Sequence, residues 1–156
     1  MGVIDPSTAR VKTDSIYPEP YASEMAGRSS LRLGEAAALT QFGVNLVTLE
    51  PGARSSLRHW HLAEDEFVMV TAGELVLLQD EGEHVLHPGD CAAWKAGDRN
   101  GHCFVNRTDA VARFLVVGSK APREVATYSD VDLVMTVEAG TMTLTYRDGT
   151  PWTGPR

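Results

Sequence analysis

The stretch that says most about the fold of this chain is residues 52–73, which read GARSSLRHWHLAEDEFVMVTAG. Two histidines, His59 and His61, stand one residue apart; a polar turn follows, and then an apolar run that opens with Glu66. Alternate side chains of a β-strand lie on one face, with about 6.5 Å between their Cα atoms. Both imidazoles are therefore expected on one face, with the carboxylate of Glu66 beside them on the next strand. Such a set suits a first-row divalent cation.

Three other histidines could complete this set of ligands. His102 follows a glycine-containing turn and opens an apolar run, so it is expected on a strand of the same interior. His84 and His87 border the turns at Gly82 and at residues 88–89, where a histidine is usually a solvated loop residue. His102 is therefore the preferred third ligand.

Outward from these residues, the chain from residue 42 onward consists of short apolar and β-branched runs separated by Gly, Pro and Asp. Many short strands and little helix predict an all-β sandwich, jelly roll or barrel. A short helical turn is expected within residues 33–40. The expected strands are 43–49, 56–61, 66–71, 74–79, 83–86, 91–94, 102–106, 113–118, 133–137 and 141–147.

The length of 156 residues is that of one ordinary domain. Residues 1–35 are rich in Pro, Ser and charge, and Tyr17-Pro18-Glu19-Pro20-Tyr21 suits neither a helix nor a central strand. We therefore expect an N-terminal arm over residues 1–35 that lies across the barrel. Residues 36–156 are expected to form one β-barrel domain that includes a closing hairpin over residues 134–146.

The composition argues against several classes of partner. The formal net charge is -7, and the arginines are scattered singly, so nucleic acid is not expected as a partner. No leader or spanning segment is apparent in the sequence, which indicates a cytoplasmic protein without a membrane partner. Cys91 and Cys103 are the only cysteines, and both are expected to be reduced, buried and inert.

The same residues resemble the two motifs of the cupin superfamily. Residues 52–73 resemble the first motif, Gly-x5-His-x-His-x3–4-Glu-x6-Gly, with Glu66 and Gly73 at the required spacing. The second motif, Gly-x5-Pro-x-Gly-x2-His-x3-Asn, is matched by Gly89, Gly97, His102 and Asn106.

Three departures from these motifs all fall in turns. Gly52 precedes His59 by one residue too many, and Lys95 stands in place of the motif proline. Four residues instead of two separate Gly97 from His102. Longer turns cost little free energy, so these changes concern the entrance of the site more than its ligands.

The resemblance implies a double-stranded β-helix, the jelly-roll barrel of cupins, with little helix. It implies one divalent metal ion, Fe, Mn, Zn, Ni or Cu, held by His59, His61, His102 and Glu66. Glu66 has an alternative role as a free base. Small cupins with additional strands also often pair across a dimer, so a homodimer is expected.

Other residues near the motifs have two interpretations each. Phe104 shares the parity of His102 and can line the cavity, while Asn106 is expected to bond the turn at the strand end. Lys95 either borders the entrance or is solvated. Glu64 and Asp65 either support a ligand imidazole or are solvated.

Three functions of different classes follow. The preferred one is an oxidoreductase or dioxygenase that acts on a small polar, oxygen-containing molecule, since two histidines and a carboxylate resemble the site of non-haem oxygenases. The alternatives are an enzyme like the sugar-phosphate isomerases or lyases, and a sensor that binds a small molecule without turnover. No catalytic residue outside the metal ligands is assigned.

Overall fold

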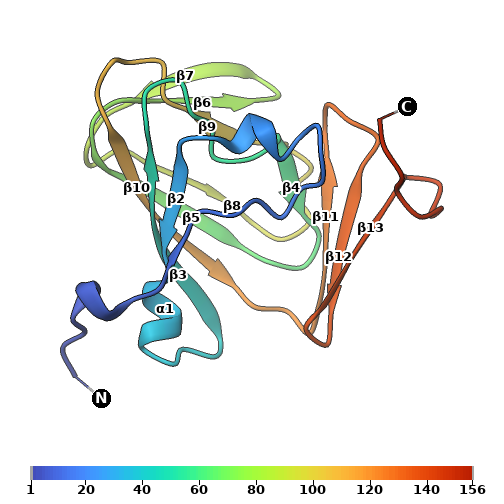
Figure 1. Ribbon diagram of the computed structural model, residues 1–156, viewed down its shortest axis with the longest axis horizontal. Coiled ribbons are helices and arrows are strands. Elements are labelled where there is room, and N and C mark those ends of the chain that lie inside the picture. Colours follow the sequence, from blue (N-terminus) through green and yellow to red (C-terminus); the bar gives the residue numbers. More distant parts are fainter. Residues whose placement is uncertain (1, 156) are drawn as a thin grey trace.

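The computed structural model describes residues 2–155 as two layers of antiparallel strands with very little helix (Figure 1). The helical segments are η1 (Pro6–Thr8), η2 (Ser23–Met25) and α1 (Leu33–Ala36). The strands are β1 (Val11–Lys12), β2 (Arg28–Leu31), β3 (Phe42–Leu49), β4 (His59–His61), β5 (Glu66–Ala72), β6 (Leu75–Gln79), β7 (Gly82–Leu86), β8 (Cys91–Trp94), β9 (Cys103–Val105), β10 (Ala112–Ser119), β11 (Arg123–Tyr128), β12 (Val134–Glu138) and β13 (Thr141–Thr145).

The strands form one large sheet and two smaller ones that face it. The large sheet has the order β1-β2-β3-β10-β5-β8, and the smaller sheets have the orders β13-β12-β11-β4 and β7-β6-β9. Isolated bridges pair His59 with His102 and Arg54 with Val105, and so join the two smaller sheets into one layer. Strands that are distant in the sequence are thus neighbours within two facing layers, which is the arrangement of the predicted jelly roll.

The main core lies between the two layers. Val68 and Val70 on β5 are almost fully buried and alternate with residues that point away from the core, as expected for a sheet with one apolar face. Val47 and Leu49 on β3 and Phe114 on β10 are buried beside them. Because the strand parity of Glu66 matches that of these valines, its carboxylate also points between the layers.

The predicted strands overlap strands of the structure, and α1 lies within the predicted helical turn. Strands β1 and β2 of the arm and strand β11 were not predicted. The inward positions of β11 are Glu124, Ala126 and Tyr128, all buried. A carboxylate, a small residue and a phenol do not make the apolar alternation by which a strand is recognised, so the segment resembles a loop.

The N-terminal residues extend the large sheet and also cover one end of the barrel (Figure 1). Strand β2 pairs with β3, and β1 pairs with β2. Tyr17 is buried against Tyr128 with an edge-to-face ring contact of 5.4 Å between centroids. These contacts fasten the segment to the barrel, whereas the boundary between arm and domain at residues 35 and 36 stays a prediction. The closing hairpin is present as β12 and β13.

The two cysteines have different surroundings. Cys103 is buried, and burial raises the pKa of its thiol, in agreement with an inert role. Cys91 is exposed, so its predicted burial is wrong. It lies on β8, the edge strand of the large sheet, opposite Met69, which alternates with the buried Val68 and Val70. Within residues 2–155, no helix is long and apolar enough to cross a membrane.

Candidate metal centre

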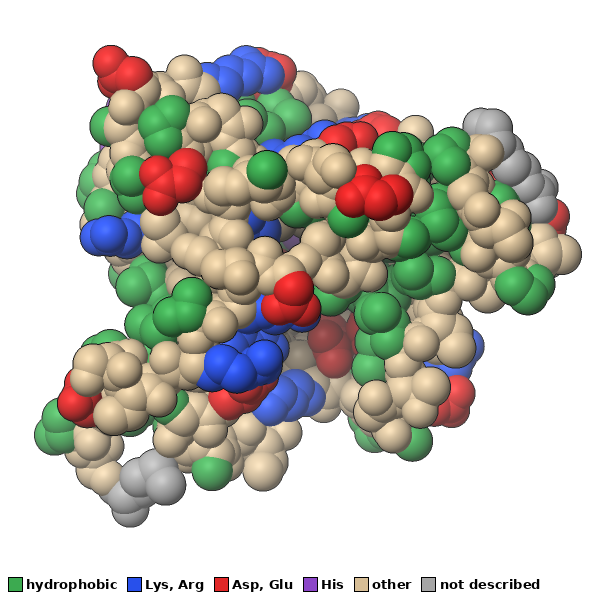
Figure 2. Space-filling model, viewed as in Figure 1, with side chains coloured by type: hydrophobic (Ala, Val, Ile, Leu, Met, Phe, Trp, Pro, Cys, Tyr) green, Lys and Arg blue, Asp and Glu red, His purple; other side chains and the backbone are tan. Residues whose placement is uncertain are grey.

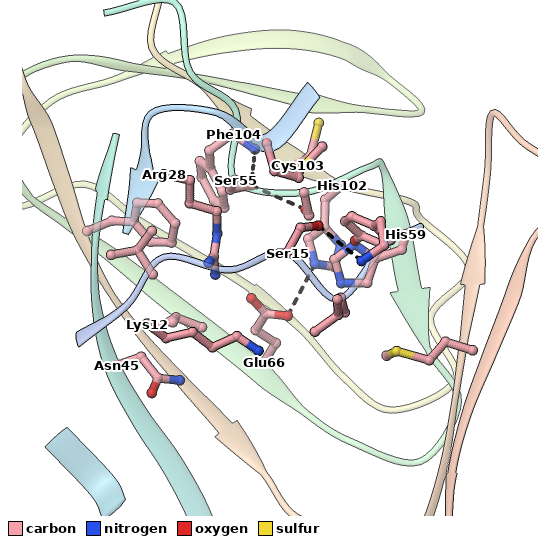
Figure 3. A pocket seen from close by; sticks show the side chains of 18 of the residues that line it. Lys12, Ser15, Arg28, Asn45, Ser55, His59, Glu66, His102, Cys103 and Phe104 are labelled. Atoms are coloured by element: carbon pink, nitrogen blue, oxygen red, sulfur yellow. Dashed lines mark hydrogen bonds and ion pairs between the residues drawn. The ribbon is translucent and has the colours of Figure 1, made fainter. Parts of the chain in front are cut away.

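A cavity of about 360 Å³ lies between the layers at the end covered by the arm (Figure 3). Its wall combines residues of the large sheet, residues of the facing layer and the arm segment 12–17. His59, His61, Glu66 and His102 all line this one cavity. The four side chains that the sequence analysis selected therefore lie together, although they come from three separate stretches of the chain.

The distances among these side chains are short. The Nε2 atom of His61 lies 3.1 Å from Oε2 of Glu66, and Nε2 of His102 lies 3.4 Å from the same oxygen. Potential ligand atoms of His59, His61 and Glu66 all lie within 4.8 Å of one another. The ring centroids of His59 and His102 are 5.4 Å apart.

Backbone pairing holds the two distant histidine strands in place. The amide of His102 donates to the carbonyl of His59 over 2.9 Å, and the amide of His59 donates back over 3.2 Å. The ring of His102 stacks on Trp94 with 3.6 Å between centroids and 9° between planes. The stacking fixes the plane of this imidazole, which is only 2% exposed.

Hydrogen bonds define the tautomers of two of the imidazoles. Nδ1 of His59 lies 2.8 Å from the carbonyl oxygen of Leu57, and Nδ1 of His102 lies 3.1 Å from that of Asn100. A carbonyl oxygen can only accept, so both Nδ1 atoms carry the proton. In the neutral form of either ring Nε2 then has a free lone pair, which is the state in which imidazole binds a metal.

His61 is supported by a carboxylate that the sequence analysis missed. Oε1 of Glu124 on β11 lies 3.5 Å from Nδ1 of His61. The two oxygens of this buried carboxylate accept from the amides of Leu62 and Ala63, each over 2.8 Å. Glu124 is therefore held rigidly behind the ring, near enough for an ion pair with His61, although Nδ1 of His61 makes no hydrogen bond within the described residues.

Burial and internal hydrogen bonds determine the ionisation of the cluster. Burial, together with His61 and His102, lowers the pKa of His59 to about 4, so this ring is neutral at pH 7. Burial opposes ionisation of Glu66, but hydrogen bonds to His102 and His61 outweigh it and hold the pKa of Glu66 well below its usual range. Burial alone would lower the pKa of His61, but the nearby carboxylates of Glu66, Glu124 and Glu64 outweigh it and raise this pKa.

The ionised carboxylate of Glu66 faces two imidazole nitrogens at 3.1 and 3.4 Å, and each contact is favourable only where a proton or a metal ion lies between oxygen and nitrogen. An imidazole that carries a proton on Nε2, or a metal ion shared by all, meets this condition. The neutral His59, the ionised Glu66 and the engaged Nδ1 atoms of His59 and His102 make the site suited to a divalent metal.

The remaining predicted residues have clear positions. Phe104 lines the cavity, as expected. The fully buried Asn106 donates to the carbonyls of Leu49 and Ala110 and accepts from Thr108, so it bonds the turn as predicted.

Five residues had open or weaker interpretations, and of these Glu64 lies beside the cluster, with a ligand atom within 4.8 Å of those of His61 and Glu124. Asp65 accepts from the amide of Ala96, and Glu64 accepts from the amide of Ala121. Lys95 is exposed and does not line the cavity. His84 and His87 are exposed on and after β7, away from the cluster.

Basic side chains from the arm and β2 line the same cavity. They are Lys12, Arg28 and Arg32. The view of the space-filling structure in Figure 2 shows lysine and arginine side chains near the middle of this face, beside a hollow. The sequence interpretation of the scattered arginines as solvated surface is therefore wrong for Arg28, which is half-buried and lines the cavity.

Comparisons with known proteins agree with this architecture. The cupin domain family model matches residues 45–118. The structure of a sugar phosphate isomerase of the cupin superfamily from Silicibacter pomeroyi is 56% identical, with 97% of each chain covered and a TM-score of 0.95. No curated protein matches the sequence.

Two more distant structures share the fold. A candidate sugar phosphate isomerase from Acidithiobacillus ferrooxidans is 24% identical over 81% of each chain, with a TM-score of 0.73. A polyketide cyclase from Streptomyces resistomycificus is 20% identical over 76% of this chain and 79% of its own, with a TM-score of 0.61. At these identities the likeness concerns the fold alone.

Proposed function

Because this chain belongs to the cupin superfamily, we propose that it is a metal-dependent isomerase of a small sugar phosphate. One observation carries the proposal: three imidazoles and one carboxylate converge in a cavity large enough for a small substrate. His59, His61, His102 and Glu66 would hold the ion. When bound there, a divalent metal supplies a Lewis acid that polarises a carbonyl of the substrate.

The residues of the chain contribute position and charge to this chemistry. Trp94 and the backbone carbonyls of Leu57 and Asn100 fix the rings, so that the ligand atoms are preorganised. Glu66 directs Oε2 at the imidazoles. We propose that this oxygen is a metal ligand. In the other interpretation Glu66 is a free base, and its carboxylate would then transfer protons of the substrate.

The preference for an isomerase differs from the order given by the sequence, which placed dioxygenase chemistry first. The metal ligands suit both, since His59, His61 and Glu66 also resemble the facial set of non-haem oxygenases. The isomerase is favoured by the name of the 56% identical protein from Silicibacter pomeroyi, with which the chain aligns over 97% of its length. The homodimer and the cytoplasmic localisation stay predictions.

The two chemistries differ in their use of oxygen. We expect the metal-loaded protein to convert an aldose phosphate to its ketose without oxygen, and to lose this activity after chelation. NMR spectroscopy of a panel of aldose phosphates under nitrogen measures the product, and an oxygen electrode measures uptake in air. Turnover that requires oxygen would favour the dioxygenase. Tight binding without turnover would favour the sensor.

Glu124 provides a test of the metal site that leaves its ligands in place. Replacing Glu124 by glutamine removes the charge behind His61 and is expected to weaken metal affinity by about 10- to 100-fold. Competition with a coloured chelator measures the affinity. Glu138→Gln, on the exposed end of the neighbouring strand β12, is the matched control and should bind metal like the wild type. Equal affinities in all three proteins would contradict a metal at His61.

A further inference from the structure

Arg28 lines the cavity and forms no ion pair with any residue that the structure describes. Its Nε atom is buried and makes no hydrogen bond, and burial lowers the pKa of its guanidinium. Arginine remains charged even so, because its ordinary pKa is above 12. Figure 3 shows the side chain extending from β2 into the cavity, on the side of Glu66 away from β4. The charge thus lies at the substrate space and not on the outer surface.

Other arginines of the described chain show what partners a guanidinium usually has here. Arg58 forms ion pairs with Asp80 and Asp130 at 2.6 and 2.7 Å, and Arg107 pairs with Glu83 at 2.6 Å. Within residues 2–155, no carboxylate forms an ion pair with Arg28; its charged or ionisable neighbours are Tyr17 and the like-charged Arg32.

Burial of an unpaired charge is costly, and structural arginines avoid the cost by pairing. The cost at Arg28 is explained if an anion from outside the chain completes the pairing. The cavity beside it is open to such a ligand, and its polar wall includes Ser15, Asn45 and Ser55.

A second cation reaches the same space from the arm. Figure 3 shows the ammonium group of Lys12 pointing into the cavity near Glu66. Its side chain is 22% exposed, and its carboxylate neighbour, Asp14, is 3.5 Å away and largely exposed. Arg32 adds charge at the rim, where it pairs with Glu35. A guanidinium and an ammonium group on one anion favour a dianion with several oxygens, such as a phosphate monoester, over a carboxylate.

We propose that Arg28, assisted by Lys12, binds the phosphate group of the substrate and so determines the specificity of the site for phosphorylated sugars. The inference rests on the proposed function for the identity of the substrate, but it concerns residues separate from the metal ligands. It also gives the N-terminal arm a function, because the arm carries Lys12 and lines the cavity over residues 12–17.

The test compares three metal-loaded proteins: the wild type, Arg28→Gln and the control Arg113→Gln. Arg113 lies on β10 with an exposed side chain and does not line the cavity. Inorganic phosphate is the probe, with chloride at equal ionic strength as the reference. Calorimetry measures affinity, thermal unfolding measures Tm, and elemental analysis measures metal in every sample.

We expect Arg28→Gln to bind phosphate at least about tenfold more weakly than the wild type, since it loses a hydrogen-bonded ion pair. Its Tm without phosphate should equal or exceed that of the wild type, because an unpaired buried charge has been removed, and phosphate should no longer raise it. Arg113→Gln should match the wild type. If Arg28→Gln does not fold, Lys12→Gln on the arm should show the same loss in smaller measure.

The outcomes separate the inference from the proposed function. Equal phosphate affinity in the wild type and Arg28→Gln would overturn the inference, even with a full complement of metal, because phosphate would then bind elsewhere. A lower Tm in Arg28→Gln with an undiminished phosphate shift would also overturn it and assign Arg28 a structural role. Phosphate binding that depends on Arg28, in a protein that takes up no metal at the histidines when metal is supplied, would support the inference and refute the proposed function.

Discussion

Replacing His102 by alanine is expected to remove the bound metal and the activity together. The imidazole is buried, stacked on Trp94, and within 3.4 Å of Glu66, so water cannot replace it in the same geometry. Loss of a direct ligand should weaken metal binding by more than about 100-fold, the upper end of the effect of residues that only support ligands. Elemental analysis of protein purified without chelator measures the loss, and the isomerase assay measures its consequence.

The matched control for this substitution is His84→Ala. His84 is exposed on β7 and lies outside the cavity of the metal ligands, so its removal tests for nonspecific binding by histidine. It should retain the metal content and activity of the wild type. A His102→Ala protein that carried as much metal as the wild type would show that the metal is bound elsewhere.

Replacing Gly73 by alanine is expected to destabilise the whole barrel. Gly73 connects β5 to β6 with φ +73°, and an added Cβ would approach the Cα atom of Ala112 and the carbonyl oxygen of Val111 to 2.8 Å. The left-handed conformation costs a non-glycine residue roughly 1–2 kcal/mol, and forced repacking adds about 1–3 kcal/mol. Urea unfolding should show a loss of about 3 kcal/mol, or about 10 °C in Tm.

Gly52→Ala separates the two contributions to this loss. Gly52 has a similar φ of +80°, but nothing lies within 4 Å of an added Cβ. Only the conformational cost remains, about 1 kcal/mol. Equal losses at Gly73 and Gly52 would show that the contact with β10 does not limit the first position.

The sequence predicted the parts of this molecule that depend on local alternation. The spacing of His59 and His61 places both on one strand face, and the parity of Glu66 with Val68 and Val70 directs its carboxylate inward. The meeting of these residues with His102 depends on the bridge between β4 and β9, a pairing across more than forty residues. Alternation alone does not specify such a pairing, and the resemblance to the cupin motifs supplied it.

Glu124 and Arg28 were beyond the reach of sequence reasoning for a common reason. Both are charged residues at inward positions, and the default interpretation of a charged residue is solvated surface. Because Glu124 interrupts the apolar alternation of β11, this strand was interpreted as a loop. Arg28 was grouped with the scattered arginines. What distinguishes them is burial together with a missing or rigid partner, which becomes visible only in three dimensions.

The net charge of -7 likewise describes the outer surface and not the cavity. It argues against nucleic acid as a partner, since long-range repulsion depends on the total charge. It does not argue against a small phosphorylated ligand, because short-range attraction depends on local charges and Lys12, Arg28 and Arg32 line the cavity. A protein of this charge can therefore bind a small anion.

The most direct test of the account is an anomalous difference map from crystals of the metal-loaded protein, measured at the absorption edge of the metal that elemental analysis identifies. The account predicts one strong peak at about 2.0–2.3 Å from Nε2 of His59, His61 and His102 and from a carboxylate oxygen of Glu66. A peak elsewhere, or ordinary water density between the imidazoles of a metal-replete crystal, would contradict it.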